Sequence, residues 1–448
     1  MQFEKTDRIA YINFLKSKYE MWTGEVLVKS YPYHLGIDPS SFCQLRCPLC
    51  PTGIENESKK SGQQVKLRNR AMLSEELLDA LLDELGDYLF LIMFYNWGEP
   101  LLNKNLPNLI RKVKAHNIYT EIHTNLSLRI STQFMEDLLL SGVNEIAASI
   151  DGFSQESYQT YRQGGNFKLA KNNIERLAGL RDKLGLNTKI IWNFLVFSFN
   201  EHEIEATREH CEQNRITFNQ REAFIDNPDW LPSYRKNEVN LQAEIEHPAT
   251  NQVPEPTQLQ EFAASSPCAW HYNYSIVNAD GSVSPCCAPW EQEHDFGLLN
   301  PGYVSFADVW NNNLYRKSRG VFAHEEIKGL DKIETLCLKC PFGESIQNLY
   351  SPLDADVINQ FNKVFKGSDP LLEHAFTLLG DKEFFIEFFK DNLADGSLPI
   401  HNTNSEILIK TSKGHSERLD HENRLVRSLA FVIQKLIRLY TKLAHHKH

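Results

Sequence analysis

The stretch Cys43–Cys50 reads CQLRCPLC, in which three cysteines follow the spacing C-x3-C-x2-C. Three soft thiolates on one short loop favour an iron–sulfur cluster, because cysteine is the usual ligand of such clusters. A four-iron cluster has four irons to ligate, so Cys43, Cys47 and Cys50 leave one iron open to a small molecule. Zinc sites usually show paired C-x2-C ligands, and a disulfide framework is not expected in a chain without a signal peptide.

The bulk composition predicts a soluble, cytoplasmic protein of two to three domains. The chain has 448 residues and a net charge of −11, which argues against general affinity for nucleic acid or anionic lipid. Its longest apolar run, Tyr88 to Phe94, is far shorter than the ~20 residues that span a bilayer. We therefore expect no transmembrane segment and no nucleic-acid partner, and the nine cysteines are better explained as metal ligands than as disulfides.

Short apolar runs alternate with helical patterns from residue 35 to residue 225. The strand candidates are His34–Ile37, Leu89–Tyr95, Tyr119–His123, Glu145–Ser149, Lys189–Phe197 and Thr217–Ala223. The helix candidates are Ser74–Leu85 with Ser74 as N-cap, Leu106–His116, Ser131–Ser141, Phe167–Leu184 and Glu201–Asn214. Such alternation predicts an α/β fold with a parallel sheet of βαβ units, and six units suit a partial (β/α)6 barrel. Active sites of such folds lie at the C-terminal ends of the strands, where the cysteine loop follows the first strand candidate.

The cysteine spacing resembles the signature of the radical S-adenosylmethionine (SAM) enzymes. In that family the open iron of a [4Fe-4S] cluster chelates the amino and carboxylate groups of SAM. One electron from the cluster cleaves SAM to methionine and a 5′-deoxyadenosyl radical, which abstracts hydrogen from an unactivated C–H bond. The resemblance implies a partial barrel over residues 35–225 and a flavodoxin- or ferredoxin-type reductant.

Two further motifs follow the second and third strand candidates. Asn96–Pro100 reads NWGEP and resembles the family motif G-G-E-P, in which the glutamate, here Glu99, holds the SAM amino group. An ordinary turn is the alternative explanation. Asn125 follows the third strand, where the resemblance implies a hydrogen bond to the SAM ribose, and a helix-capping turn is equally compatible with the sequence.

Polar residues also end or interrupt the fourth and fifth strands. The run SIDG resembles that of peptide-modifying family members, in which the serine, here Ser149, contacts SAM and the aspartate, here Asp151, lies at the substrate edge. In the following YRQGG run, the resemblance implies that Arg162 pairs with the SAM carboxylate through a bidentate fork, and a surface arginine is the alternative. Asn193 interrupts an apolar strand, so its side chain needs a hydrogen-bonding partner. That partner is either SAM or, in a purely structural role, another group of the protein.

A second cysteine set has the spacing C-x17-C-x50-C-x2-C and consists of Cys268, Cys286, Cys337 and Cys340. Residues 268–345 resemble the auxiliary-cluster module of the family, the SPASM/Twitch group. About four ligands imply one auxiliary [4Fe-4S] cluster, which would transfer electrons because no iron stays open. Zinc is the alternative, because C-x2-C is also half of a zinc knuckle. Cys287 beside Cys286 is an alternative ligand, a packed thiol or a hydrogen-atom donor, and the donor role makes it the candidate catalytic residue.

The remaining segments carry weaker signals. We expect an N-terminal extension over residues 1–34, a proline-rich linker over 226–267 and a helical region over 346–448. The turn Asn278–Gly281 predicts a hairpin. The residues Arg427 to Lys442 form a basic amphipathic pattern that predicts a core-packing helix, with a membrane-surface or partner helix as the alternative. A basic segment after the cysteine triad is expected to be a solvated loop and contains Lys59, Lys60, Lys66, Arg68 and Arg70.

These features together predict a radical SAM enzyme, an oxidoreductase that oxidises, crosslinks or epimerises a ribosomally made peptide. No segment is typical of a leader-peptide-binding domain, so a peptide substrate would need a separate recognition protein or a binding site that the sequence does not reveal. A dehydrogenase or epimerase of a sugar or aminoglycoside-type substrate is the alternative. A non-catalytic zinc-binding protein is the alternative from another class.

Overall fold

The computed structural model describes residues 1–62, 66, 68–223, 225, 227–235, 267–287, 289–323, 329–330, 332–340, 351–393, 408–410 and 416–418. The chain divides into two compact units, Met1–Phe376 and Thr377–His448. Most of the predicted linker and all of the predicted helix Arg427–Lys442 lie outside the described residues. Among the helices that the structure describes, none is long and apolar enough to span a membrane.

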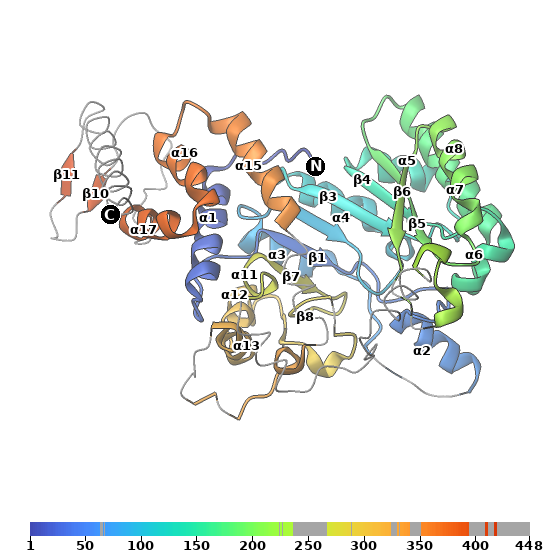
Figure 1. Cartoon of the computed structure of the whole chain (residues 1–448), viewed down its shortest axis with the longest axis horizontal. Helices are drawn as coiled ribbons and strands as arrows, with labels where there is room; N and C mark the ends of the chain where they lie inside the picture. The colour runs from blue at the N-terminus through green and yellow to red at the C-terminus, as the bar shows by residue number, and fades with distance from the viewer. Residues whose placement is uncertain are drawn as a thin grey trace, which may run out of the picture. The chain divides into compact units, whose positions relative to one another are not determined.

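One nine-stranded sheet organises the first unit, with the strand order β6-β5-β4-β3-β2-β1-β7-β8-β9 (Figure 1). Its first six strands are all parallel and pair in chain order. They are β1 (His34–Ile37), β2 (Leu91–Phe94), β3 (Tyr119–Thr124), β4 (Glu145–Ser149), β5 (Lys189–Val196) and β6 (Thr217–Glu222). This confirms the predicted α/β fold with six parallel strands, and the sheet is not closed.

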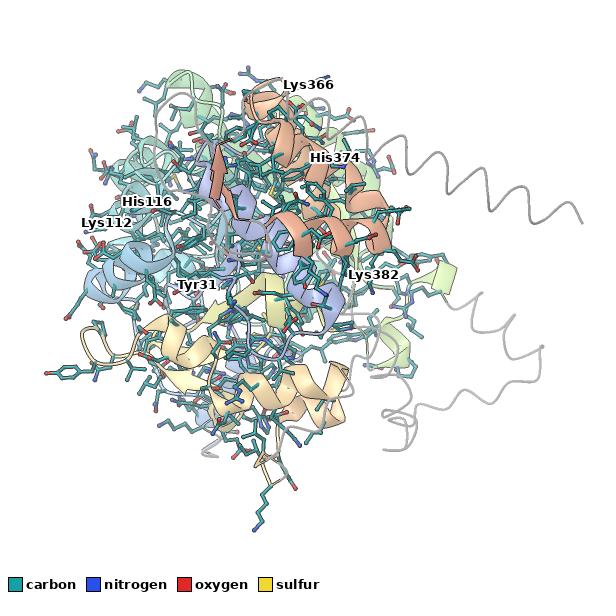
Figure 2. The ribbon with its side chains drawn as sticks, turned by 90° about the vertical axis from the view of Figure 1, so that its left-hand side faces the viewer. Tyr31, Lys112, His116, Lys366, His374 and Lys382 are labelled. Carbon is teal, nitrogen blue, oxygen red and sulfur yellow. The ribbon has the colours of Figure 1, made fainter. Side chains whose placement is uncertain are left out.

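Helices connect these strands and bury the apolar face of the sheet. They are α3 (Glu75–Leu85), α4 (Leu106–Lys114), α5 (Thr132–Leu140), α7 (Phe167–Lys183) and α8 (Ile204–Gln213), with the short 3-10 helices η1 (Pro100–Leu102) and η2 (Glu201–Glu203). The Ser74 side chain accepts a hydrogen bond from the Leu77 backbone N–H at 3.2 Å, as its predicted N-cap role requires. Lys112 of α4 forms ion pairs with Glu75 and Asp79 of α3. Figure 2 shows Lys112 at the surface of the molecule.

The two faces of the parallel sheet differ in chemistry. Because side chains alternate along a strand, every second residue faces the helices, and these residues form the apolar core. Leu35, Ile92, Ile122, Ile146 and Trp192 illustrate this face and are fully buried. The opposite face has the polar series Glu121, His123, Ser149, Asn193 and Asn219. The strand register therefore places polar side chains together on the inner face, away from the helical layer.

Two helices occupy segments where no helix was predicted. Helix α2 (Pro51–Lys60) begins directly after the cysteine triad, with Pro51 at its first position. Helix α6 (Gln155–Tyr161) begins after Ser154, whose side chain accepts a hydrogen bond from the Ser157 backbone N–H. Lys59 and Lys60 lie in the last turn of α2 rather than in a loop.

The second cysteine set belongs to a smaller module that extends the same sheet. Strand β7 (Tyr274–Val277) pairs in parallel with β1, and β8 (Ser282–Ser284) and β9 (Gly297–Leu298) continue antiparallel. The predicted hairpin turn Asn278–Gly281 joins β7 to β8, and Gly281 has a φ of +87° that favours glycine. The other elements here are α11 (Trp270–Asn273), η4 (Gln292–His294), α12 (Phe306–Trp310), α13 (Asn313–Ala323) and η5 (Leu336–Lys339), while η3 (Pro228–Trp230) follows β6.

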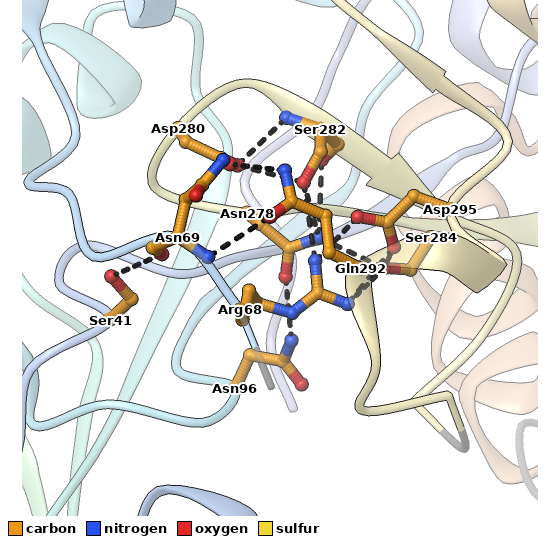
Figure 3. Close-up of polar contacts among 10 residues, drawn as sticks. All are labelled: Ser41, Arg68, Asn69, Asn96, Asn278, Asp280, Ser282, Ser284, Gln292 and Asp295. Carbon is orange, nitrogen blue, oxygen red and sulfur yellow. Dashed lines mark hydrogen bonds and ion pairs between the residues drawn. The ribbon is translucent and has the colours of Figure 1, made fainter. Parts of the chain in front are cut away.

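A buried polar network joins this module to the segment after the cysteine triad (Figure 3). Arg68 forms an ion pair with Asp295, whose two oxygens lie 2.5 and 3.0 Å from the guanidinium nitrogens. The same guanidinium donates to the Ser282 and Ser284 hydroxyls. Arg70 pairs with Glu55 of α2 at 3.0 Å. The prediction of a solvated basic loop is therefore wrong for both arginines, which join elements far apart in the sequence.

The N-terminal helix α1 (Arg8–Thr23) packs against later helices of the first unit, α15 (Ser351–Phe365) and α16 (Pro370–Thr377). Tyr11 meets Phe361 edge to face and Phe14 stacks on Phe376, while Lys18 pairs with Asp354 at 2.6 Å. The second unit, described by itself, contains η6 (Leu378–Gly380), α17 (Lys382–Asn392) and a two-stranded ladder of β10 (Leu408–Lys410) and β11 (Ser416–Arg418).

Candidate active site

The cysteine triad forms a tight loop between the end of β1 and helix α2. Cys50 is the residue before the first turn of α2, and its backbone N–H donates to the Cys47 carbonyl at 3.2 Å. The Asn56 side chain of α2 donates to the backbone carbonyl of Cys43 at 2.8 Å. A Cβ atom added to Gly53 would lie 2.2 Å from the Cys47 carbonyl oxygen. The first turn of α2 thus packs directly on the backbone of the loop, which fixes the spacing of the three cysteines.

The environment of the three thiols fits an iron–sulfur ligand set. Burial raises the pKa of Cys43, and it raises the pKa of Cys47 to about 11 against the opposing effect of Arg162. The neighbouring Cys47 and Cys50 thiols add to the rise at Cys43, so the three groups share one electrostatic neighbourhood. Iron binding would release protons from these thiols, because the ligand is the thiolate.

Glu99 lies at the end of β2 and is almost fully buried. Its Oε1 accepts from the Thr124 hydroxyl at 2.6 Å and from the Leu101 backbone N–H at 3.1 Å. Its Oε2 accepts from the Asn125 backbone N–H at 2.8 Å. A carboxylate offers about four lone-pair sites, so these three bonds leave room for one further donor. Burial raises the pKa of Glu99. The three hydrogen bonds and the positive charge of Arg162 both oppose that rise.

The backbone before Glu99 touches the backbone of the cysteine loop. The Glu99 N–H donates to the Phe42 carbonyl at 2.7 Å, and a Cβ on Gly98 would lie 1.4 Å from the Ser40 carbonyl oxygen. Only glycine permits this approach. Asp38 is fully buried near this contact, and backbone N–H groups face its carboxylate. Burial nevertheless raises the pKa of Asp38 to about 7.

Asn125 contacts both its own loop and the cysteine loop, and its expected hydrogen bond to the SAM ribose stays a prediction. Its Oδ1 accepts from the Ser127 backbone N–H at 2.8 Å, which forms a local turn, whereas the next helix, α5, is capped by Ser131 and not by Asn125. The same oxygen accepts from the Gln44 side chain at 2.8 Å, and Nδ2 lies 3.7 Å from the Cys43 sulfur. Asn125 therefore joins the end of β3 to the cysteine loop, and its amide faces the first cysteine.

Arg162 also lies beside the cysteine loop. Its Nε donates to Asp151 at 2.6 Å, and its guanidinium carbon lies 5.1 Å from the centre of the Tyr161 ring. A side-chain hydrogen bond links it to Cys47 and lowers the pKa of that thiol. Asp151 is fully buried and also accepts from the Leu195 backbone N–H at 2.8 Å. The Asp151 carboxylate therefore holds Arg162 in place, and its expected position at the substrate edge stays a prediction.

Ser149 and Asn193 are paired residues on β4 and β5, so both side chains lie on the inner face. Asn219 of β6 pairs with Asn193 in turn, and its Nδ2 donates to the Asn193 Oδ1 at 2.7 Å. The structural partner that a buried Asn193 needs is therefore Asn219. No local pattern singles out Asn219, because its role depends on the register of β5 and β6.

A second inner-face group was not assigned a role from the sequence. His123 of β3 hydrogen-bonds through Nε2 to Glu121 on the same strand. The Tyr95 ring stacks on His123 with centroids 3.9 Å apart and an interplanar angle of 11°. His123 and Glu121 keep exposed fractions of 16% and 11%, so neither is sealed in the core. Strand rise is about 3.3 Å per residue, so His123 lies about 7 Å along β3 from Asn125 and the cysteine loop.

The second cysteine set gathers around His271 and Tyr315. The Cys337 sulfur lies 3.4 Å from the His271 Nε2. Burial raises the pKa of Cys268, and the Cys337 and Cys340 thiols add to that rise. Cys286 and Cys337 both act on the pKa of Tyr315, which burial raises. The fold thus brings the four predicted ligands into one neighbourhood, whereas Cys287 is exposed.

In the part of the chain that the structure describes, no three His, Cys, Asp or Glu side chains surround a point suited to a single metal ion. The thiolates of a four-iron cluster bind different irons, so they are spread farther apart than the ligands of one ion.

Comparisons with known proteins assign this arrangement to a family. Residues 37–211 match the Radical SAM superfamily, and residues 268–341 match SPASM, described as an iron-sulfur cluster-binding domain. The chain belongs to the radical SAM superfamily. It carries a C-terminal SPASM module, which confirms the resemblance that the two cysteine sets suggested.

Similar proteins include two kinds of cyclase. The chain is 24% identical over 322 residues to the PqqA peptide cyclase of Granulibacter bethesdensis, covering 66% of this chain and 76% of that protein. It is 25% identical over 181 residues to a probable GTP 3′,8-cyclase of Methanococcus maripaludis, covering 40% of this chain and 55% of that protein. The structure of Streptococcus suis SuiB bound to S-adenosylmethionine shares 16% identity and a TM-score of 0.43, covering 70% of this chain and 73% of that one.

Proposed function

We propose that this radical SAM enzyme acts on a peptide, using one SAM-binding [4Fe-4S] cluster and one auxiliary [4Fe-4S] cluster. When bound, the first cluster would supply the electron that cleaves SAM, and the resulting 5′-deoxyadenosyl radical would abstract a substrate hydrogen atom. The observation that carries the proposal is the convergence of Cys43, Glu99, Asn125 and Arg162 on one loop at the C-terminal ends of β1 to β4.

The chain's own residues would divide the binding of SAM among them. Cys43, Cys47 and Cys50 hold the cluster, and the remaining acceptor site of Glu99 takes one N–H of the SAM ammonium. The Nε edge of Arg162 is fixed by Asp151, which orients its terminal N–H groups for the cluster side of the site. This orientation supports a charge-assisted contact with the SAM carboxylate.

Ser149 and Asn193 would line the adenosine side, because their register places both on the inner face, one and two strands beyond the strand that leads to Asn125. Farther along the inner face, the Glu121–His123 pair and Tyr95 offer a polar surface for the substrate. These side chains are partly exposed and lie on the side of the sheet that the helices leave uncovered.

The peptide substrate class is supported by the similarity to a PqqA peptide cyclase over 66% of this chain. The auxiliary cluster, held by Cys268, Cys286, Cys337 and Cys340, would accept the electron that remains after hydrogen abstraction. The reaction would then be a net oxidation or crosslink. Cys287 is the candidate for the alternative role of hydrogen donor in an epimerisation, and burial raises the pKa of its thiol to about 11.

Iron and sulfide analysis of anaerobically reconstituted protein tests the two-cluster proposal. We expect two four-iron clusters in the wild type. A Cys43/Cys47/Cys50→Ala variant and a Cys337/Cys340→Ala variant should each lose about half of the iron while keeping the wild-type circular dichroism. Zinc without sulfide in the wild type would contradict the proposal and favour the zinc-binding alternative.

A further inference from the structure

One sulfur of the second cysteine set lies within hydrogen-bonding distance of several polar side chains. His271 Nε2 lies 3.4 Å from the Cys337 sulfur. The Ser318 and Thr335 side chains also hydrogen-bond Cys337. The Ser318 and Thr335 hydroxyl oxygens lie 3.0 Å apart, so both O–H groups are beside the sulfur and can turn toward it when Cys337 is a thiolate. Three polar side chains from three separate segments therefore meet at one thiol, and His271 and Ser318 are both buried.

The His271 ring is held firmly in this position. Its plane is parallel to the Phe296 ring at a centroid distance of 6.3 Å, and the Tyr315 ring meets it edge to face at 6.0 Å. Its backbone carbonyl accepts from the Arg319 Nε at 2.9 Å. Arg319 is itself fully buried and lies over the Trp310 ring at 4.7 Å. Such a fixed ring keeps Nε2 directed at the sulfur without a large entropic cost.

We propose that His271, together with Ser318 and Thr335, raises the reduction potential of the auxiliary cluster through hydrogen bonds to the Cys337 sulfur. Adding an electron makes the cluster and its thiolates more negative, so donors at a ligating sulfur stabilise the reduced state more than the oxidised state. This inference rests on the proposed function, in which that cluster accepts one electron from a substrate radical while the substrate loses a proton to solvent. A higher potential favours electron flow in that direction.

The test uses the full-length chain with Cys43, Cys47 and Cys50 changed to alanine, so that only the auxiliary set holds a cluster. After anaerobic reconstitution with iron and sulfide, the midpoint potential is measured by redox titration monitored by electron paramagnetic resonance. We expect His271→Phe to lower the equilibrium constant for reduction about tenfold, which is about 59 mV for one electron. Ser318→Ala should shift the potential in the same direction.

Two further variants separate hydrogen bonding from packing. His271→Gln keeps an N–H donor near the position of Nε2 and should restore most of the potential. Ser275→Ala removes a buried hydroxyl of the same module that bonds Tyr315, and should leave the potential unchanged. A wild-type potential in both His271→Phe and Ser318→Ala would overturn the inference while leaving the two-cluster proposal intact.

Cluster retention is read from iron content in the same samples. If His271→Phe loses the cluster and His271→Gln keeps it at the parent potential, a role of the Nε2 donor at Cys337 is supported. Loss of iron from both variants would overturn the inference, because His271 would then be needed to build the site. Absence of any cluster in the parent triple variant would overturn the two-cluster proposal itself.

Discussion

Gly98→Ala should remove the SAM-binding cluster although it adds only one methyl group. A Cβ at this position would lie 1.4 Å from the Ser40 carbonyl oxygen and 3.0 Å from that of Phe42. Non-bonded carbon and oxygen atoms need more than about 3 Å, so the Ser40 backbone must retreat by about 2 Å. The clashing atoms belong to the main chain, so no change of side-chain rotamer can relieve the clash. The hydrogen bond from the Glu99 N–H to the Phe42 carbonyl is then lost as well.

The cost of such overpacking is typically about 1–3 kcal/mol or more. Because Ser40 leads directly into the cysteine loop, we expect the strain to displace that loop rather than unfold the sheet. Anaerobically reconstituted Gly98→Ala should therefore hold about half of the wild-type iron and bind SAM at least tenfold more weakly. Iron and sulfide per chain and calorimetric SAM binding measure these effects.

Gly179→Ala is the matched control. Gly179 lies inside α7 with no atom within 4 Å of the added Cβ, and Ala is favoured over Gly in a helix by about 1 kcal/mol. Iron content and SAM affinity should stay at wild-type values in this variant. If Gly98→Ala also kept full iron and unchanged SAM affinity, the contact between the two backbones would not position the cluster loop.

Glu99→Gln should weaken SAM binding by about 1.5–3 kcal/mol, or tenfold or more, because it removes one charge-assisted contact. Arg162→Lys should do the same while keeping a cation beside Asp151, and unchanged affinity in both variants would reject this placement of SAM. Asp38→Asn should flatten the pH dependence of stability. Burial raises the Asp38 pKa from 3.8 to about 7, so the protonated form favours folding and stability falls as the pH rises through 7. The variant should gain up to about 4 kcal/mol over the wild type at pH 8 and little at pH 4 in urea unfolding, and an equal difference at both values would refute this. Finally, Cys337→Ala/Cys340→Ala should still cleave SAM to 5′-deoxyadenosine in reduced protein, and loss of that cleavage would show that the second module is required for the first step.

Local sequence patterns were enough for the parallel sheet. Strand β4 has the predicted bounds Glu145–Ser149, and β1 matches His34–Ile37, because buried parallel strands are short apolar runs between helical patterns. The fold class also followed from the alternation of apolar runs with helical patterns along the sequence. The cysteine spacing pointed to the family because three ligands within eight residues depend on one loop alone.

Contacts between distant residues were not predictable in the same way. The ion pair of Arg68 with Asp295 depends on β7 joining β1, and nothing local in the sequence requires that strand to extend the first sheet. The packing of His271 against Cys337 likewise depends on how α11 and η5 meet. Long-range pairs of this kind are set by tertiary structure.

Helix α2 shows why local propensity can mislead. Its sequence contains Gly53 and several polar residues, and it was expected to continue as a loop. In the structure, the Asn56 side chain hydrogen-bonds the cysteine loop, and the lack of a side chain at Gly53 lets the helix backbone contact that loop closely. These tertiary contacts stabilise the helix. Propensity is a weak guide where tertiary contacts of this kind decide.

The most direct test of the account is SAM cleavage by the reduced protein. Anaerobically reconstituted wild type, treated with dithionite and SAM, should release 5′-deoxyadenosine and methionine in equal amounts. The Cys43/Cys47/Cys50→Ala variant, matched for folding by circular dichroism, should release neither. Absence of 5′-deoxyadenosine from a wild-type sample that holds both iron and sulfide would contradict the assignment of the SAM site.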